Sequence, residues 1–192
     1  GSAIPSAVSA YDIDNSVRFN AGDAAYLSKT FSAGDQKTWT FSCWYKMGSV
    51  MPANNQHFLA QLNSSENYGQ FYHENTTGYL RLINKVQSGS GSTTVLTTNA
   101  TYRDPGSWYH IVCKYDSTPS TPGSSDCAFF VNGEQVSLRT SDYPTQNDEG
   151  YINGTEEMQI GHNEGESDTF DGYLAEVYFI DGTAYDADDF GE

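Results

Sequence analysis

The sequence predicts an all-β fold, an antiparallel two-sheet β-sandwich of the jelly-roll type with eleven or more short strands. The chain carries 14 Tyr, 10 Phe, 3 Trp and 18 Gly among 192 residues; aromatic residues favour strands and Gly favours turns. Apolar and polar side chains alternate in many short segments, and turn residues separate these segments at regular spacing. No window with helical periodicity exceeds about ten residues.

The chain length suits one undivided β-sandwich, and we expect a single domain over residues 16–192. Residues 1–15 form a leader that lacks the basic and apolar regions of a signal peptide. The opening Gly1-Ser2 looks like a cloning scar, so we expect the natural chain to begin near Ala3. Whether the chain is a fragment of a longer protein stays open at this stage.

The segment TWTFSCWYKM, residues 38–47, gives the clearest strand. Its odd positions are apolar or aromatic, and its even positions are polar except for Trp44. This two-residue period predicts a strand with one buried face. The same period continues in three shorter segments, namely Phe58/Ala60/Leu62, Phe71/His73 and Leu80/Leu82.

The second half of the chain begins with WYHIVCKYD, residues 108–116, which is apolar on both faces, as is typical of a covered central strand. Asn132-Gly133 predicts a two-residue hairpin turn, because both residues tolerate positive φ. Residues 158–162 and 173–181 give the last two strands. Asp181-Gly182 turns the chain toward YDADDFGE, where we expect one helical turn. The expected loops are residues 48–56, 63–68, 84–92, 116–126, 139–156 and 163–169.

The three cysteines are too few and odd in number for a complete disulfide framework. Cys113 and Cys127 lie on successive predicted strands and could oppose each other in a hairpin. A slip of one residue in register would place them on opposite faces, so pairing stays open. Buried free thiols are the simpler expectation.

The charge balance excludes some partners. Nine basic residues against 25 acidic residues give a net charge of −16. This surface disfavours nucleic acid, which is bound by Lys and Arg, and anionic membranes for the same reason. A neutral partner, or one bridged by cations, fits better. No segment approaches the roughly 18 consecutive apolar residues of a membrane span.

Several ordered segments resemble the laminin-G-like branch of the concanavalin A-like jelly rolls. They are SVRFNAGDAAYLS, KTWTFSCWYK, RDPGSWYHIVCKYD, FFVNGEQV, QIGH and FDGYLAEVYFIDGTAYDADDFGE, and together they extend from near Ser16 to Glu192. Within that superfamily the chain is most similar to jelly-roll proteins of environmental, notably marine, bacteriophages. The resemblance implies a virion structural or adhesion protein at the virion surface, such as a tail-fibre, baseplate or capsid-decoration component.

Catalysis is not expected. Retaining glucanases of this superfamily place two carboxylates on one strand face, about 5–5.5 Å apart. Glu176 and Asp181 are five residues apart and would point to opposite faces of an uninterrupted strand. The four histidines lack metal-ligand spacing, and no Gly-x-Ser-x-Gly elbow occurs. We expect His110 to be a buried, hydrogen-bonded histidine.

A structural Ca²⁺ is implied by the resemblance, because many laminin-G-like domains hold one with Asp side chains and backbone carbonyls. Asp23 and Asp171 match positions where related folds bring the first and last strands together. Both residues could equally serve in turns.

A glycan site is predicted from the aromatic residues that do not fit the core. If the alternating apolar residues face inward, then Trp44, Tyr72, Tyr79 and Arg81 face outward on one sheet. Exposed aromatic rings stack on pyranose rings, and Arg supplies directional hydrogen bonds. Four loop residues could complete the site: Tyr68, Tyr143, Tyr151 and His162. Alternatively, these rings pack under loops or form a subunit interface.

The sequence therefore predicts a non-enzymatic module, exposed on a phage particle, that attaches to a host-surface or environmental glycan. The alternative is a capsid-decoration or tail protein whose outward rings contact other virion proteins or further copies in a homo-oligomer.

Overall fold

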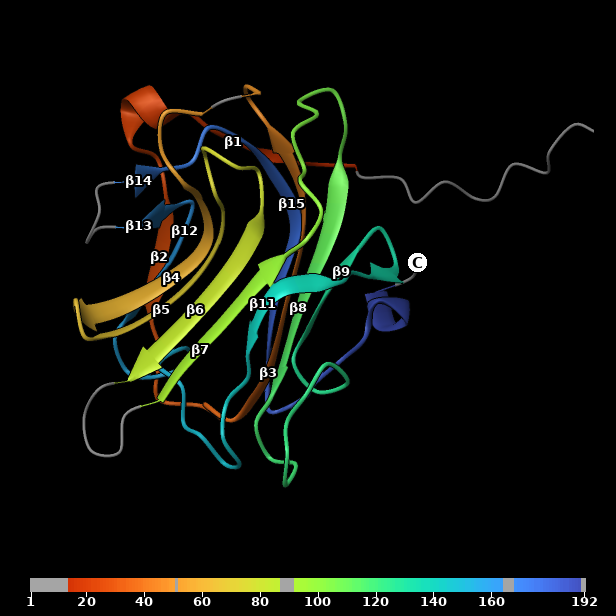
Figure 1. The fold of residues 1–192 in the computed structure, drawn as a ribbon. Helices are drawn as coiled ribbons and strands as arrows, with labels where there is room; N and C mark the ends of the chain where they lie inside the picture. Colours follow the sequence, from red (N-terminus) through yellow and green to blue (C-terminus); the bar gives the residue numbers. More distant parts are fainter. Residues whose placement is uncertain (1–13, 51, 87–91, 164–167, 191–192) are drawn as a thin grey trace, which may run out of the picture.

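The computed structural model describes residues 14–50, 52–86, 92–163 and 168–190 (Figure 1). The fold is nearly all-β, with two large antiparallel sheets packed face to face, as the sequence predicts. In the described part of the chain, no helix is long and apolar enough to cross a membrane. The expected leader lies almost entirely outside the described residues, so its boundary with the domain stays a prediction.

One layer is a six-stranded sheet with β3 and β8 at its centre. Its spatial order is β1 (Val17–Phe19), β15 (Gly172–Asp181), β3 (Thr38–Met47), β8 (Tyr109–Asp116), β9 (Ala128–Val131) and β10 (Glu134–Gln135). Strand β3 has the predicted bounds. Asn132 and Gly133 have φ values of 51° and 82° and connect β9 to β10, which confirms the predicted hairpin turn.

The other layer is a seven-stranded sheet, and its strands β4 and β5 are strongly curved (Figure 1). Its spatial order is β11 (Leu138–Asp142), β7 (Ser92–Thr98), β6 (Leu80–Val86), β5 (Asn67–His73), β4 (Gln56–Ser64), β12 (Glu157–Ile160) and β2 (Leu27–Thr30). A separate small hairpin pairs β13 (His162–Asn163) with β14 (Asp168–Thr169). Two short 3-10 helices, η1 (Ala21–Asp23) and η2 (Ala187–Phe190), complete the fold, and η2 is the helical turn expected near the C-terminal end.

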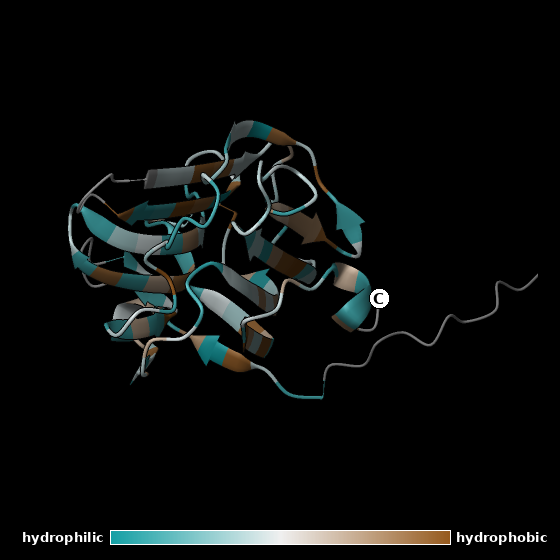
Figure 2. Cartoon of the chain, turned by 90° about the horizontal axis from the view of Figure 1, so that it is seen from below, coloured by the Kyte–Doolittle hydropathy of each residue, from teal (hydrophilic) through white to brown (hydrophobic). Residues whose placement is uncertain are grey.

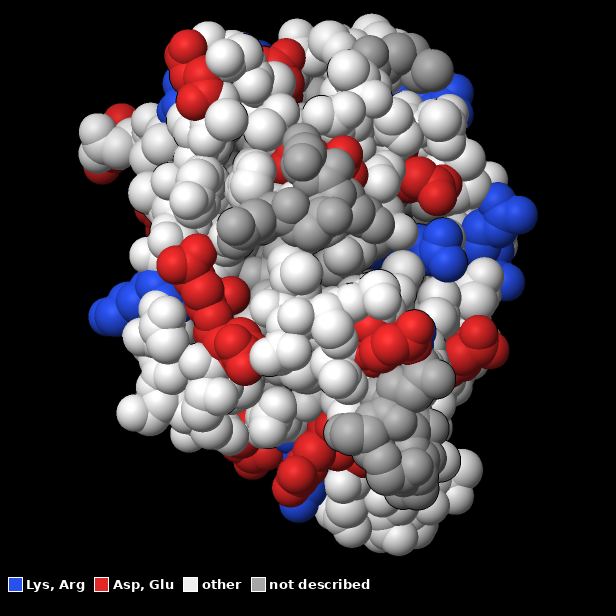
Figure 3. All heavy atoms as spheres, turned by 90° about the vertical axis from the view of Figure 1, so that its left-hand side faces the viewer, with Lys and Arg blue, Asp and Glu red and all other residues white. Residues whose placement is uncertain are grey.

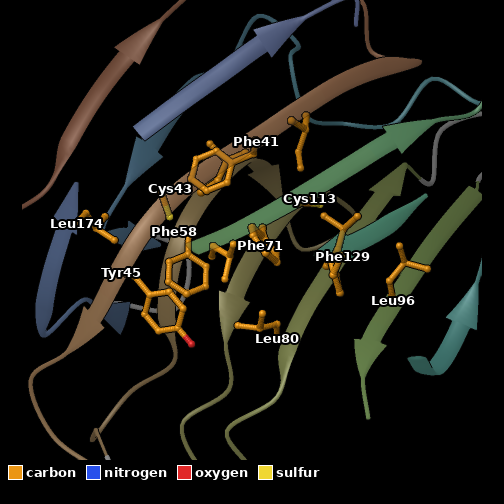
Figure 4. Close-up of a cluster of buried hydrophobic side chains, with 14 of the residues drawn as sticks. Phe41, Cys43, Tyr45, Phe58, Phe71, Leu80, Leu96, Cys113, Phe129 and Leu174 are labelled. Carbon is orange, nitrogen blue, oxygen red and sulfur yellow. The ribbon is translucent and has the colours of Figure 1, made fainter. Parts of the chain in front are cut away.

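The core lies between the two sheets and is built from inward side chains (Figure 4). Hydrophobic and hydrophilic residues succeed one another along the strands (Figure 2). Phe41 and Tyr45 of β3 face the opposite sheet, where their rings contact Phe71 and Phe58 at centroid distances of 5.9 and 4.8 Å. Phe71 also stacks on Phe129 of β9 at 5.2 Å. All five rings are fully buried, so the alternation of β3 directly specifies one wall of the core.

The predicted alternation fails in β4, because the β4–β5 register shifts between His57 and Leu59. Phe58 and Leu59 both enter the core at this bulge, whereas Ala60 leaves the core cluster. The predicted grouping of Phe58 with Ala60 on one inward face is therefore wrong.

Several expected loops contain strand residues. Strand β11 occupies the start of the expected 139–156 loop, and β4 and β5 are joined by a tight turn within the expected 63–68 loop. The sequence predicts neither β1 nor β2, which are short, nor β7, whose Ser and Thr residues follow a Gly/Ser-rich stretch. Residues 87–91 and 164–167 of two expected loops lie outside the described residues.

The cysteines are free and buried, which confirms the simpler expectation and excludes a Cys113–Cys127 bridge in this structure. Burial raises the pKa of Cys43 and Cys113 well above the usual thiol value. Burial also raises the pKa of Cys127, to about 12. These thiols are therefore protonated at neutral pH and pack as small apolar groups.

Candidate functional site

The outward side of the six-stranded sheet carries a band of aromatic rings, which we call the aromatic face. Strand β3 contributes Trp44, because even positions of β3 point away from the core. The other members come from β15 and from segments next to the sheet: Trp108, Tyr173, Tyr178 and Tyr185. Three of these rings are well exposed, with Tyr173 at 37%, Tyr178 at 47% and Tyr185 at 36%.

The middle of the aromatic face is formed by Trp44 and His110. These residues pair across β3 and β8, and their ring centroids are 5.0 Å apart. His110 is 2% exposed, and its Nε2 lies 2.9 Å from the hydroxyl of Ser42. The expectation of a buried, hydrogen-bonded His110 is confirmed, although this histidine lies on the outward side of the sheet and beneath Phe190 of η2.

One end of the aromatic face has polar groups fixed beside its rings. The Tyr173 ring lies 6.3 Å from Trp108, and the Arg18 guanidinium lies 5.1 Å from the same tyrosine ring. Arg18 also forms a 2.7 Å ion pair with Asp171. A cation over a tyrosine ring is stabilising, so this end presents a ring together with a positioned guanidinium and carboxylate.

The other end is shaped by a β-bulge in β15, where the register with β3 shifts between Ala175 and Tyr178. Glu176 adopts a left-handed backbone conformation with φ of 50°. The bulge turns Tyr178 outward, and its hydroxyl donates a 2.6 Å hydrogen bond to Glu176 Oε2. The uninterrupted strand assumed from the sequence is therefore wrong.

Asp181, the other carboxylate of this strand, serves a structural purpose. It accepts hydrogen bonds of 2.7 Å from the Asp35 amide and of 2.7 Å from Asn153 Nδ2. These contacts fix two loops against the end of β15. Glu176 and Asp181 thus belong to different local structures.

The predicted ligand-binding residues do not share one sheet. Tyr72, Tyr79 and Arg81 belong to the seven-stranded sheet and its β5–β6 connection, whereas Trp44 belongs to the six-stranded sheet. The prediction that Trp44 lies beside them is wrong. The alternation identifies Trp44, Tyr72 and Arg81 as outward residues of their own strands, but the sequence does not show which strands share a sheet.

On the seven-stranded sheet the predicted ligand-binding side chains are either buried or already in contact with other side chains. Tyr72 is only 6% exposed and packs against His57, with centroids 4.9 Å apart. Arg81 lies 3.6 Å from Glu74. The guanidinium of Arg139 lies 4.5 Å from the Tyr79 ring centroid. A sugar could stack on Tyr72 only after the side chains that bury this ring, such as His57, had moved.

The four expected loop residues are dispersed. Tyr68 is in β5 and lies 5.7 Å from the Lys85 ammonium, whereas His162 is in β13 and stacks on Tyr26 at 4.8 Å. Tyr151 lies in the loop before β12, and burial raises its pKa to about 12. Tyr143 lines a cavity at the edge of the sandwich. None of the four belongs to the aromatic face.

Comparison with known proteins establishes the family. The family described as the concanavalin A-like lectin/glucanases superfamily matches residues 19–188. The chain belongs to the concanavalin A-like lectin/glucanase superfamily. No curated protein sequence matched the chain.

Solved structures share this concanavalin A-like fold at low sequence identity. Tailspike protein 2 of Escherichia coli O157:H7 bacteriophage CAB120 aligns with a TM-score of 0.58 and 15% identity over 86% of this chain and 22% of the tailspike. Mouse laminin α1 domains LG4-5 align at 0.57 and 10% over 87% and 41%. The Ruminococcus gnavus IT-sialidase CBM40 bound to α2,3 sialyllactose aligns at 0.54 and 14% over 86% and 95%. The chain thus spans less than half of the tailspike and laminin chains.

The two residues expected to hold calcium have other partners in this concanavalin A-like domain. Asp171 is paired with Arg18, and Asp23 accepts a 2.8 Å hydrogen bond from Asn20 Nδ2. Among the described residues, no group of three or more His, Cys, Asp or Glu side chains is arranged to hold a metal ion. Backbone carbonyls can also ligate Ca²⁺, so calcium binding at Asp23 and Asp171 stays a prediction.

Of the residues on the aromatic face, only Trp44 was predicted from the sequence as part of a binding site. Tyr178 points outward only because of the bulge, which strict alternation cannot reveal. Trp108 lies in a segment that is apolar on both faces and therefore resembles a strand covered on both sides. The alternation at the start of β15 was the one available signal for an outward Tyr173, because the next residue, Leu174, enters the core.

Proposed function

We propose that this protein is a non-enzymatic glycan-binding module and that sugar rings stack on its aromatic face. The exposure of Tyr173 and Tyr178 beside Trp44 carries the proposal. Pyranose rings have apolar faces that pack on such rings, while their hydroxyls bond to polar groups at the rim. Arg18, Asp171 and the carboxylate of Glu176 supply these groups.

The net charge of −16 favours a neutral glycan over an acidic one as the ligand. On the face shown in Figure 3, acidic side chains lie in separate groups rather than in one patch. A negatively charged protein repels acidic sugars at a distance. We therefore expect a neutral oligosaccharide, bound with a dissociation constant near the millimolar range.

The module is proposed to be exposed on a bacteriophage particle and to bind host-surface or environmental glycan. The ordered sequence resemblance to phage jelly rolls supports this placement, and the fold shared with a phage tailspike is consistent with it. Many copies on one particle would convert weak individual binding into firm attachment.

An oligosaccharide array, run with and without calcium and followed by calorimetry on the best neutral ligand, tests the proposal. Trp44→Ala and Tyr173→Ala should each weaken binding about 5- to 13-fold, since an aromatic contact contributes about 1–1.5 kcal/mol. Tyr26→Ala removes a tyrosine that is 46% exposed outside the aromatic face and should leave affinity unchanged. Saturable binding that survives both aromatic-face substitutions would rule out this face.

The same exposed rings favour one alternative, a structural protein whose aromatic face forms a subunit interface. Tyr, Trp and Arg are enriched in such interfaces. Light scattering distinguishes the two functions. A stable oligomer that dissociates on Tyr173→Ala, together with no glycan signal, would support the structural protein.

A further inference from the structure

A second candidate site lies at the edge of the sandwich, whereas the aromatic face lies on the outward side of a sheet. A cavity of about 380 Å³ opens where the chain passes from β10 of the six-stranded sheet to β11 of the seven-stranded sheet. None of its lining residues belongs to the aromatic face. Gln135 fixes one wall, because its Nε2 donates a 2.7 Å hydrogen bond to the carbonyl of Ser124 in the β8–β9 connection.

The polar part of the lining consists of hydroxyl groups and one amide. Tyr143 lines the cavity, and its hydroxyl interacts with the hydroxyls of Ser124 and Ser141. Ser137 and Gln135 add a further hydroxyl and an amide. Hydroxyls both donate and accept hydrogen bonds and can rotate to suit a partner. This wall therefore matches a ligand that itself carries several hydroxyls.

The apolar part of the lining is contributed by Val136 and Leu138, which pack against the main core as Tyr143 does. The described residues that line the cavity include no Asp, Glu, Lys, Arg or His. Burial raises the pKa of Tyr143, and the neighbouring Cys127 raises it further. Because Tyr143 and Cys127 are both neutral at physiological pH, the cavity has no fixed charge to pair with an ionic ligand.

We propose that this edge cavity binds one neutral sugar ring of the pyranose class, separately from the aromatic face. Its volume is at the lower end of the roughly 300–1,000 Å³ of ligand pockets, which suits a single ring rather than an extended chain. The Tyr143 ring and the two aliphatic side chains contact the apolar side of the sugar. The serine hydroxyls and Gln135 bond to its hydroxyls.

Ligand-observed NMR on the full chain tests the cavity, with glucose, galactose, mannose and N-acetylglucosamine as separate probes. We expect at least one of these sugars to bind saturably. Ser141→Leu fills the cavity and should weaken that binding about tenfold or more, whereas Tyr143→Phe removes only the hydroxyl and should weaken it several-fold. Ser28→Leu makes the same change on the other edge strand, β2, and should have no effect.

Trp44→Ala separates this proposal from the aromatic-face proposal. Monosaccharide binding by the cavity should persist in Trp44→Ala, even if oligosaccharide binding is lost. The cavity proposal is overturned if none of the four sugars binds, if binding survives both Ser141→Leu and Tyr143→Phe, or if Trp44→Ala abolishes it. Tyr143→Phe keeps the test valid if Ser141→Leu fails to fold, because it adds no atoms.

Discussion

Glu176 is the residue at which β15 departs from a regular strand. A left-handed backbone costs a non-glycine residue about 1–2 kcal/mol, and such strain often accompanies function. Here the strained conformation places the Glu176 carboxylate against the Tyr178 hydroxyl on the aromatic face. The bulge thus positions both a ring and a hydrogen-bonding group for a ligand.

Substitution at residue 176 measures this strain. Because the backbone conformation is fixed by pairing with β3, Glu176→Gly should be more stable to unfolding than Glu176→Ala by about 1 kcal/mol. Urea denaturation of the two variants gives the difference directly. Equal stability, or a more stable alanine variant, would show that residue 176 is not held at positive φ in solution.

His73 makes the stability depend on pH. The residue is 1% exposed, and its Nε2 donates a 2.7 Å hydrogen bond to the Tyr102 carbonyl. Its Nδ1 has no hydrogen-bond partner among the described residues. A second proton would place a full positive charge on this buried ring. Burial accordingly lowers the pKa of His73, and the nearby Arg103 contributes in the same direction.

The direction of the pH effect follows from this lowered pKa. Below the unfolded value of about 6.5, the unfolded chain binds a proton that the folded chain does not. The free energy of unfolding should therefore fall as the pH drops from about 6.5 to the folded pKa, by about 1.4 kcal/mol for each unit of pKa difference. His73→Gln keeps a donor for Tyr102 and should reduce this loss, as measured by urea titrations at neutral and mildly acidic pH. An identical pH dependence in the variant would contradict the assignment.

At the scale of elements, buried amides of the strands hold the long loop before β12. Gln61 of β4 is 1% exposed. Its Oε1 accepts from the Asn153 amide at 2.8 Å, and its Nε2 donates to the carbonyl of Glu156 at 2.7 Å. Asn84 of β6 accepts from the Tyr151 amide at 2.6 Å. These side chains replace the hydrogen bonds that an irregular loop cannot make with itself.

Removing the Gln61 amide should therefore lower the free energy of unfolding by more than an average substitution does. Gln61→Leu leaves loop backbone groups unpaired in a buried site, and we expect the free energy of unfolding to fall by about 2–4 kcal/mol. Gln146→Leu, an exposed change in the same loop, should alter it by less than about 0.5 kcal/mol. Equal effects of the two changes in thermal denaturation would mean that the loop is not anchored through β4.

The sequence predicts individual elements where one physical rule dominates. Strand β3 alternates at every position except Trp44, and Asn132-Gly133 suits only a tight turn, so both are confirmed. Bulges in β4 and β15 depend on long-range pairing and have no local signal. Polar inward residues such as Gln61 and Asn84 are specified by loop atoms far along the chain. Strand β7 is rich in Ser and Thr, whose pattern resembles a connector.

At the scale of the whole molecule, the candidate site depends on which strands share a sheet. The sequence identifies Trp44 as outward, but the order β15–β3–β8 is what brings it next to Tyr173 and Trp108. The same topology sends Tyr72 and Arg81 to the opposite side. A local pattern therefore selects candidate residues, whereas only the assembled sandwich decides which of them can meet one ligand.

The chain's 3 tryptophans provide the most direct measurement. Trp44 and Trp108 belong to the aromatic face, whereas Trp39 is fully buried in the core. In an NMR titration with the best neutral oligosaccharide, the indole N–H signals of Trp44 and Trp108 should shift saturably with one dissociation constant, and that of Trp39 should stay in place. Saturable binding that leaves the indole signals of Trp44 and Trp108 in place would contradict glycan binding by the aromatic face, if only the signals of Tyr72 and Arg81 shift.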